Sequence, residues 1–457
     1  MSRICLIFPR FRYPSGDPPL GVAYLAAAVS AWTEWQVDLI DTTFFTEPDK
    51  ELADRLSGGD YQAVGISFMT PMLREAMGAA ELVRQLNPQA VIIAGGPHPT
   101  VDPDHVMANS AFDMVVVGEG DVTLSELLNN DCEPTEVAGL IYRLDGQIQR
   151  NDPRPALADL DTLPFPALDL LDMESYKERW FLLDSVRLGL KGTSIMTSRG
   201  CPYHCAYCQP TLERLFGRKH RRRSPANIVA ELVSLKERFD LDAFALQDDT
   251  FLINKGSAME FCRVMEEADL NMTWECNLRA NLVDEEVLAA MYRVGLRKVN
   301  IGIESANQRI LDEVFQKQIS WQDVERALNI CNNLNLAIQG YFMLGAPSET
   351  LAEVLKTIWT AARLNIDDAT FSITTPLPHT YLYDRTRSLI DREFEDFDYY
   401  TTSVYRRGIT LSPTLLFWLK RLAFFSFYLA PQRILKTLGM VFNPLNISRT
   451  IVKLKRL

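Results

Sequence analysis

The sequence contains no uncharged apolar run of the ~18 residues that a helix needs to cross a bilayer. The longest such run near the C-terminus, Leu422–Ala430, is far shorter. A secretory signal is also missing, because Met1-Ser2-Arg3 leads directly into the strand-length run Ile4–Phe8. We therefore expect a cytoplasmic protein whose eight cysteines serve as thiols or metal ligands rather than as disulfide partners.

Acidic residues are absent from the last part of the chain. No Asp or Glu follows Asp398, so the net charge of −12 joins a tail of +10 to a body of −22. The acidic body argues against a general nucleic-acid-binding protein, which is usually basic, and we expect no nucleic-acid partner. The basic residues of the tail are Arg406, Arg407, Lys420, Arg421, Arg433, Lys436, Arg449, Lys453, Lys455 and Arg456.

Residues 401–457 combine these basic side chains with leucines and with aromatic residues such as Phe417, Trp418 and Phe425. A basic amphipathic helical segment of this kind can lie peripherally on an anionic membrane surface, here the inner face. It can equally form a helical subdomain that packs on the acidic body, and the sequence leaves both interpretations open. Membrane docking would make a lipid substrate more plausible.

Residues 1–150 alternate short apolar runs with helical patterns, which predicts a doubly wound, Rossmann-like parallel sheet in an α/β fold. Residues 151–190 hold four prolines and little periodicity, as expected of a linker. The expected strands of the first sheet are Arg3–Pro9, Val37–Asp41, Ala63–Phe68, Ala90–Ala94 and Phe112–Val117, followed by a hairpin of Gly139–Arg143 and Gln147–Arg150.

A second strand–helix series fills residues 191–400. Six such units favour a partial (β/α)6 barrel, although periodicity alone leaves an ordinary doubly wound sheet open. Ser224-Pro225 provides the N-cap and the first residue of one predicted helix. The expected strands are Ser194–Ser198, Ala243–Gln247, Thr273–Leu278, Lys298–Ile303, Ala337–Leu344 and Thr370–Thr374.

Three of the eight cysteines, Cys201, Cys205 and Cys208, fall within eight residues. A short loop with three thiolates can bind one face of an iron–sulfur cluster. Structural zinc prefers four ligands, and here the fourth would have to be His204 or a distant cysteine. The spacing therefore favours a four-iron cluster with one open iron, to which a reactant can bind.

Preceded by Thr197-Ser198-Arg199-Gly200, this loop resembles the signature of the radical S-adenosylmethionine (SAM) superfamily. Four further segments resemble its subgroup with an N-terminal cobalamin (B12)-binding domain, and the resemblance covers about residues 1–400. It implies three cofactors: a [4Fe-4S] cluster, SAM and cobalamin. The four segments are Gly217–Pro225, Gln247–Phe251, Gly302–Ser305 and Gly340–Glu349.

The resemblance implies reductive cleavage of SAM at the cluster to a 5′-deoxyadenosyl radical, with an external one-electron reductant of the flavodoxin or ferredoxin type. Cys201, Cys205 and Cys208 would then be the metal ligands. The implied SAM-binding residues are Tyr207, Asp248, Asp249, Arg279, Glu304, Gly345 and Glu349. Taken alone, the aspartates could be solvated loop residues, Glu304 a helix N-terminal carboxylate and Arg279 a salt-bridge partner. The basic run 218–223 could bind an anionic substrate or be a solvated lead-in to a helix.

The chain lacks the Asp-x-His-x-x-Gly motif through which some cobalamin domains ligate cobalt. The resemblance therefore implies cobalamin without a protein histidine below the cobalt, or a degenerate domain. His98 is expected to be a packed or a surface residue rather than a ligand. The expected cobalamin-binding residues lie at the carboxyl ends of strands and are Leu20, Gly21, Ser67, Gly95, Gly96 and Gly118.

Among radical SAM reactions, the resemblance most directly implies a class B (cobalamin-dependent) methyltransferase that acts on an unactivated carbon of a small molecule or lipid. A radical cyclase or oxidoreductase acting on a lipid, isoprenoid or tetrapyrrole-like substrate is the alternative within the family. A non-enzymatic cobalamin-binding or electron-transfer protein is an alternative of another class. A ferredoxin-like carrier would require four cysteine ligands for each cluster, whereas only three are grouped here.

Overall fold

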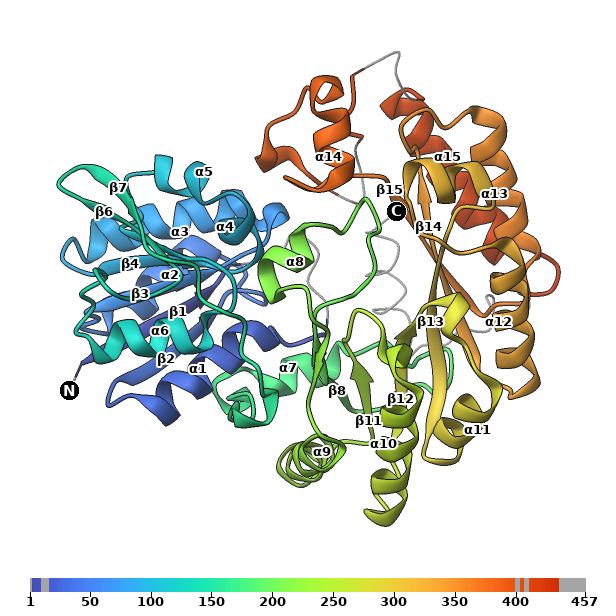
Figure 1. Ribbon diagram of the computed structural model, residues 1–457, viewed down its shortest axis with the longest axis horizontal. Helices are drawn as coiled ribbons and strands as arrows, with labels where there is room; N and C mark the ends of the chain where they lie inside the picture. Colours follow the sequence, from blue (N-terminus) through green and yellow to red (C-terminus); the bar gives the residue numbers. More distant parts are fainter. Residues whose placement is uncertain (1, 10–15, 399–402, 407–410, 435–457) are drawn as a thin grey trace. The chain divides into compact units, whose positions relative to one another are not determined.

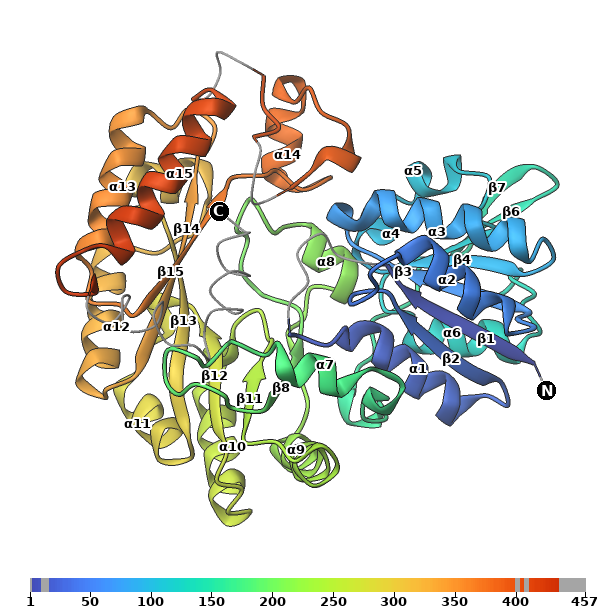
Figure 2. The same ribbon diagram turned by 180° about the vertical axis from the view of Figure 1, so that it is seen from behind.

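The computed structural model describes residues 2–9, 16–398, 403–406 and 411–434. They form two compact units, drawn from opposite sides in Figures 1 and 2. The first unit takes in residues up to Glu178 together with Ser198–Pro202 and Pro210–Arg223. The second takes in Arg179–Thr197, Tyr203–Gln209 and the described residues from Ser224 onward.

The first unit is built on a seven-stranded sheet in the order β2-β1-β3-β4-β5-β6-β7. The first five strands are parallel, and β6 and β7 add an antiparallel hairpin at one edge. The predicted doubly wound sheet is confirmed, because the strand order reverses between β1 and β3. Ligands of such sheets bind at the carboxyl ends of the strands beside this reversal. The strands are β1 (Arg3–Phe8), β2 (Gln36–Asp41), β3 (Ala63–Ser67), β4 (Val91–Gly95), β5 (Met114–Val116), β6 (Leu140–Leu144) and β7 (Gln147–Arg150).

Helices cover both faces of this sheet, as Figure 1 shows. Helix α1 packs with α6, and α2 packs with α3. In α3 the buried Ala76, Ala80 and Val83 repeat at helical spacing, which presents one apolar stripe to the sheet. The helices of this unit are α1 (Leu20–Trp32), α2 (Pro48–Ser57), α3 (Leu73–Leu86), α4 (Pro97–Val101), α5 (Pro103–Ala108), α6 (Gly120–Asn129), α7 (Met173–Glu178) and α8 (Thr211–Phe216).

The second unit is built on six parallel strands in the order β8-β11-β12-β13-β14-β15. Each strand lies beside the one that precedes it in this series, so right-handed connections place the intervening helices on one outer face. The predicted partial barrel is therefore confirmed, and the doubly wound alternative is wrong for this unit. The strands are β8 (Gly192–Ile195), β11 (Ala243–Leu246), β12 (Thr273–Leu278), β13 (Leu296–Glu304), β14 (Ala337–Leu344) and β15 (Asp368–Ile373).

The α-helices between these strands lie around the outside of the partial barrel (Figure 1). In the first of them the Ser224 side chain accepts a hydrogen bond from the Asn227 amide and Pro225 is the first residue, as predicted. The helices are α9 (Pro225–Phe239), α10 (Lys255–Glu267), α11 (Glu285–Arg293), α12 (Trp321–Asn333) and α13 (Leu351–Arg363), and the short α14 (Tyr381–Thr386) follows β15.

The predicted strand Ser194–Ser198 is wrong in its second half. Strand β8 ends at Ile195, and Ser198–Arg199 forms a separate strand, β9, that pairs antiparallel with β10 (Arg221–Arg222). The chain leaves the parallel sheet because the Thr197 amide donates to the Asp248 carboxylate instead of continuing the ladder (2.7 Å). This break positions the cysteine loop that follows.

A hydrophobic cluster packs against the beginning of β11. Trp180, Leu183 and Leu190 pack against Ala243 and Ala245 of β11. Gly192 is required beside this cluster, because a Cβ there would lie 2.4 Å from the Trp180 ring. Part of the segment expected to be a linker therefore belongs to the core of the second unit.

The tail contributes one helix among the described residues, α15 (Pro413–Tyr428), which packs against β15 and α13 (Figure 2). Its buried residues Leu416, Leu419, Ala423 and Phe427 face these elements. The predicted helical tail is therefore present in this range, whereas residues 435–457 lie outside the described residues. Within the described parts of the chain, no helix is long and apolar enough to span a membrane.

Candidate functional site

The three clustered cysteines lie in the loop between β9 and α8. Cys205 is buried, Cys201 and Cys208 are half-buried, and all three are thiols rather than disulfide partners. The second half of the loop is held by main-chain hydrogen bonds, from the Ala206 amide to the Phe315 carbonyl (2.8 Å) and from the Cys208 amide to the Cys205 carbonyl (3.0 Å). A pinned loop that carries three thiols fits the donor set of an iron–sulfur cluster.

No group of three or more His, Cys, Asp or Glu side chains surrounds a single metal-ion position in the described ranges. Thiolates that each bind a different iron of a cluster do not need to converge on one point. The arrangement therefore gives no support to the zinc alternative that the sequence left open at His204.

A buried ion pair lies next to the cysteine loop within the second unit. The Lys317 ammonium lies 2.6 Å from Oε1 of Glu304 and 3.1 Å from the Tyr207 hydroxyl. The Tyr207 hydroxyl is 3.4 Å from the same carboxylate oxygen. Burial, together with the Glu304 charge, raises the pKa of Tyr207 well above its ordinary value, so the phenol stays protonated. The sequence predicted Tyr207 and Glu304 but missed Lys317.

The local backbone explains the Gly302-Ile303-Glu304 pattern. Glu304 adopts φ = 63°, a left-handed conformation that strains a residue with a side chain. A Cβ on Gly302 would lie 2.5 Å from the Glu304 carboxylate and 2.6 Å from the Lys317 ammonium. Glycine is therefore needed at 302, because the ion pair fills the space of its side chain.

Arg279 follows β12 and reaches the cysteine loop. Its guanidinium donates to the Cys205 sulfur (3.4 Å), lies 4.0 Å above the Tyr203 ring and donates to the Gln318 carbonyl (3.3 Å). The sequence suggested a contact with the SAM carboxylate, which stays a prediction. The observed geometry places a positive N–H donor on a ligand sulfur, and such donors tune a cluster's stability and potential.

We expect Arg279→Met to lower the reduction potential of the cluster, because a positive hydrogen-bond donor leaves the Cys205 sulfur. By analogy with other groups that support metal ligands, we also expect roughly tenfold lower cluster retention. A redox titration monitored by electron paramagnetic resonance measures the potential. Arg279→Lys keeps the charge, so its potential should lie between those of the unmodified protein and Arg279→Met. An unchanged potential in Arg279→Met would contradict this role.

Asp248 and Asp249 follow β11 but differ in their surroundings. Asp248 is buried, and its carboxylate accepts hydrogen bonds from the amide (2.7 Å) and the hydroxyl of Thr197. Asp249 is accessible to solvent, yet the surrounding protein and the Asp248 charge raise its pKa to about 6. An accessible carboxylate within a dense protein shell can receive the ammonium group of a ligand, so the geometry favours Asp249 over Asp248 for this contact.

The pKa of Asp249 makes a pH-dependent prediction. The carboxylate must be ionised to attract an ammonium group, so SAM affinity should fall as the pH drops through about 6. One pH unit below that value only about a tenth of Asp249 is ionised, which corresponds to a roughly tenfold weaker affinity. Calorimetric titration of SAM across this range measures the effect. The variant Asp249→Asn should bind weakly with no such dependence, and a slope that persists in it would assign the titration to another group.

Glu349 holds the loop after β14. One oxygen of its buried carboxylate accepts from the amides of Gly345 (2.8 Å) and Ala346 (3.0 Å), and burial raises its pKa to about 7. The other oxygen has no hydrogen-bond partner among the described residues. A Cβ on Gly345 would lie 2.7 Å from the Leu416 side chain of α15. These contacts show structural roles for both residues, and their predicted contacts with SAM stay predictions.

In the first unit, a cluster of buried charges connects β9 and β10 with the start of α6. Arg199 donates to Asp121 (2.6 Å) and to Glu119 (3.0 Å), and Arg221 donates to Glu119 (2.8 Å). Arg223 is also buried and donates to the Tyr24 hydroxyl (3.1 Å). Neither interpretation of the basic run 218–223 describes Arg221, whose side chain is 9% exposed, or the buried Arg223, because both are hydrogen-bonded inside the fold.

The residues predicted to bind cobalamin lie at the carboxyl edge of the first sheet. Ser67 ends β3 and Gly95 ends β4, while Leu20 and Gly21 begin α1. A Cβ added to Gly21 or Gly95 would meet no atom within 4 Å, so both border open space. Such space beside the reversal of strand order suits the nucleotide-like tail of cobalamin.

Gly96 and Gly118 have left-handed backbones, with φ of 96° and 83°. A Cβ on Gly96 would lie 2.9 Å from the Phe68 carbonyl oxygen. The Gly118 amide donates to the Thr100 hydroxyl (3.0 Å). Both glycines are therefore demanded by the local backbone, and their contacts with cobalamin stay predictions.

His98 is packed in the interior of the first unit. It is fully buried, with its ring nitrogens 3.0 Å from the Thr70 hydroxyl and 3.2 Å from His105. Its ring also stacks on Phe68, with centroids 5.9 Å apart. Of the two expected positions for His98, packed or on the surface, the structure shows the packed one.

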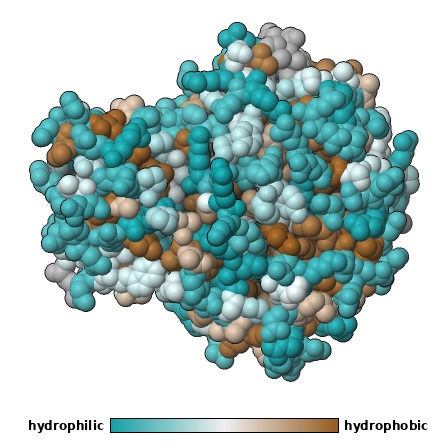
Figure 3. All heavy atoms as spheres, in the orientation of Figure 1, coloured by the Kyte–Doolittle hydropathy of each residue, from teal (hydrophilic) through white to brown (hydrophobic). Residues whose placement is uncertain are grey.

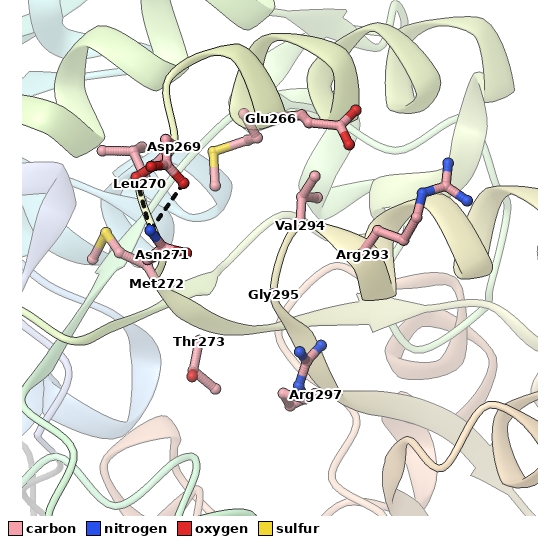
Figure 4. Close-up of a pocket in the computed structure, with 11 residues that line it drawn as sticks. Glu266, Asp269, Leu270, Asn271, Met272, Thr273, Arg293, Val294, Gly295 and Arg297 are labelled. Atoms are coloured by element: carbon pink, nitrogen blue, oxygen red, sulfur yellow. Dashed lines mark hydrogen bonds between the residues drawn. The ribbon is translucent and has the colours of Figure 1, made fainter.

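A cavity of about 250 Å³ lies at the amino-terminal ends of β12 and β13 (Figure 4). Asp269, Asn271, Arg293 and Arg297 are among its lining residues, and Asn271 donates to the Asp269 carboxylate (2.9 Å). The cysteine loop, Asp249 and Glu304 instead follow carboxyl ends of strands, where parallel (β/α) barrels place their active sites. This cavity is therefore not part of the candidate site.

Residues 15–128 match the B12 binding domain family, and residues 195–359 match the Radical SAM superfamily. The chain therefore belongs to the radical SAM superfamily, as an enzyme of the group with an N-terminal B12-binding domain. It is 33% identical to an uncharacterized methyltransferase of Pyrococcus horikoshii, over 92% of this chain and 89% of the relative.

Two further comparisons extend this picture. The chain is 26% identical to the anaerobic magnesium-protoporphyrin IX monomethyl ester cyclase of Rubrivivax gelatinosus, over 87% of this chain and 73% of the relative. The solved structure of the radical SAM methyltransferase TsrM from Kitasatospora setae, with cobalamin and a [4Fe-4S] cluster bound, matches with a TM-score of 0.68. That match has 19% identity and covers 84% of this chain and 77% of the other, which shows a shared fold.

Proposed function

We propose that this protein is a cobalamin-dependent radical SAM methyltransferase that adds a methyl group to an unactivated carbon of a small-molecule substrate. The observation that carries the proposal is the presence, in one chain, of the B12-binding match and of a radical SAM barrel whose cysteine loop includes Tyr207, which contacts Glu304 and Lys317. The relative with 33% identity is itself named a methyltransferase, which supports methyl transfer.

When bound, the cluster would supply the electron that cleaves SAM, and cobalamin would carry the methyl group. Cys201, Cys205 and Cys208 would hold the irons. Tyr207 would provide an aromatic face for the adenine. Lys317 would hold the Glu304 carboxylate in place, and this carboxylate would meet the ribose. The carboxyl edge of the first sheet would receive cobalamin. An external one-electron reductant is part of the proposal.

The proposal uses the predicted division of the chain. Residues 1–150 would form the cobalamin domain, 151–190 the linker, 191–400 the radical SAM barrel and 401–457 the basic C-terminal segment. Two parts of this division differ from the compact units of the structure. The predicted linker is shared between the units at Glu178 and Arg179, and Ser198–Pro202 and Pro210–Arg223 belong to the first unit.

We expect Gly95→Leu to lower the affinity for cobalamin by roughly tenfold or more, because its side chain would occupy the open space at the end of β4. Gly78→Leu is the matched control, since a Cβ there also meets no atom within 4 Å but lies on the exposed side of α3. Absorbance titration with hydroxocobalamin measures both affinities. Equal affinities in the two variants would contradict a cobalamin site at this edge.

Anaerobic reconstitution tests the function. Protein loaded with cluster and cobalamin is incubated with SAM and a low-potential reductant, and the nucleoside products are separated by chromatography. Both 5′-deoxyadenosine and S-adenosylhomocysteine are expected. The first product without the second would favour a radical cyclase, a reaction named for the relative with 26% identity. Neither product from protein with an intact cluster would favour a non-enzymatic role.

A further inference from the structure

Helix α15 exposes a row of large apolar side chains that we call the outer stripe. Its members are Leu415 (36% exposed), Trp418 (61%), Leu422 (38%), Phe425 (54%) and Leu429 (52%), of which the last directly follows the helix. They are spaced by three and four residues in alternation, so they share one face. Helix α13, which packs beside α15, exposes Leu351 and Trp359 as well.

The distribution of side chains around α15 reverses that of an ordinary surface helix. The lysine of the helix, Lys420, is buried. Burial lowers its pKa to about 8, against the opposing effect of the Asp398 charge. Arg421 is half-buried, with its guanidinium 3.5 Å above the Phe417 ring. The buried face already anchors the helix to β15 and α13, so packing within the chain does not require the outer stripe.

An apolar row of this length marks an interaction surface. Apolar side chains on the face drawn in Figure 3 lie among hydrophilic ones, as is usual for a protein surface. The outer face of α15 differs, because no charged side chain is exposed there. Apart from the outer stripe, the exposed residue between Pro413 and Tyr428 is the uncharged Thr414.

The charge of the tail points to the partner. The chain after Asp398 contains ten basic residues and no acidic ones. Lys420 and Arg433 are buried, so the remaining eight carry the charge that a partner could meet. An apolar row attached to an acid-free basic segment complements a surface that is apolar inside and anionic outside, which describes a membrane with acidic lipids. A second copy of the chain would bring two such basic segments together, and their like charges oppose that association.

We propose that the outer stripe of α15 docks this protein on anionic membranes. Trp418 and Phe425 would enter the boundary between headgroups and acyl chains, where aromatic side chains are favoured. Basic residues of the tail would meet the lipid phosphates. Docking is peripheral and independent of the methyl-transfer reaction, so either proposal can fail without the other.

Vesicle flotation with the full-length chain tests the proposal. Protein is mixed at low salt with vesicles of phosphatidylcholine alone or with phosphatidylglycerol added, and the floating fraction is measured. We expect binding to the anionic vesicles that weakens as salt is added. The double variant Trp418→Gln/Phe425→Gln should bind roughly tenfold less or weaker still, because two large apolar side chains no longer enter the lipid.

The matched control is Leu144→Gln/Ile148→Gln, which removes two comparably exposed apolar residues from the β6–β7 hairpin. It should float like the unmodified protein, and circular dichroism should show that both double variants are folded. Absence of flotation with anionic vesicles, or equal loss in the two variants, would overturn the proposal. Light scattering that finds a dimer dissociated by Trp418→Gln/Phe425→Gln would also overturn it, in favour of a second copy.

Discussion

Cys205→Ala is expected to abolish cluster assembly and to reduce 5′-deoxyadenosine formation by more than about 100-fold. Cys205 is the buried member of the three cysteines, and Arg279 donates to its sulfur. Alanine removes one of three thiolates. The hydrogen bond from the Ala206 amide to the Phe315 carbonyl fixes the loop, so the loop cannot shift to bring another ligand into the place of Cys205. Iron and sulfide content of the reconstituted protein measures the loss directly.

Two cysteines outside the loop provide matched controls for Cys205→Ala. Cys262 in α10 and Cys331 in α12 are buried, and burial raises the pKa of each thiol to about 12. Such thiols stay protonated and make poor metal ligands. Cys262→Ala and Cys331→Ala should therefore retain iron and activity. Loss of the cluster in either control, or its retention in Cys205→Ala, would contradict the assignment of the loop.

The parts of the fold that the sequence predicts are those set by local patterns. Each strand expected in the first sheet overlaps an observed one, because buried parallel strands are short apolar runs. The Ser224 cap was predictable for the same reason, since its hydrogen bond spans three residues. The predicted strand Ser194–Ser198 is wrong in its second half because Asp248, 51 residues away in the sequence, accepts a hydrogen bond from the Thr197 amide.

The candidate site shows the same division between local and distant causes. The cysteine spacing is a local motif, so the sequence alone predicts it. Lys317 was missed because no periodicity marks it, and its role depends on a fold that returns it to Glu304 after a π-helical turn at Ile310–Val314. The Glu119 carboxylate likewise accepts hydrogen bonds from Arg199 and Arg221, which lie 80 and 102 residues further along the chain. Contacts of this kind leave no trace in composition or spacing.

Lys317→Met is expected to destabilise the second unit by about 3–5 kcal/mol, because it leaves the Glu304 carboxylate buried without its counter-charge. Both side chains of this pair are less than a tenth exposed, so solvent screens them little. Urea denaturation measures the free energy of unfolding. Lys191→Met is the matched control, since it breaks the exposed pair with Asp240 and should cost less than about 1 kcal/mol.

The double variant Lys317→Met/Glu304→Gln separates the structural role of the pair from its role in binding. With both charges removed, no buried charge is left alone, and most of the stability lost in Lys317→Met should return. SAM affinity should not return with it, because the carboxylate proposed to meet the ribose is gone. Gly302→Ala provides an independent check, because its methyl group displaces the pair while both charges remain. If SAM affinity followed stability across all three variants, the pair would be a structural element alone.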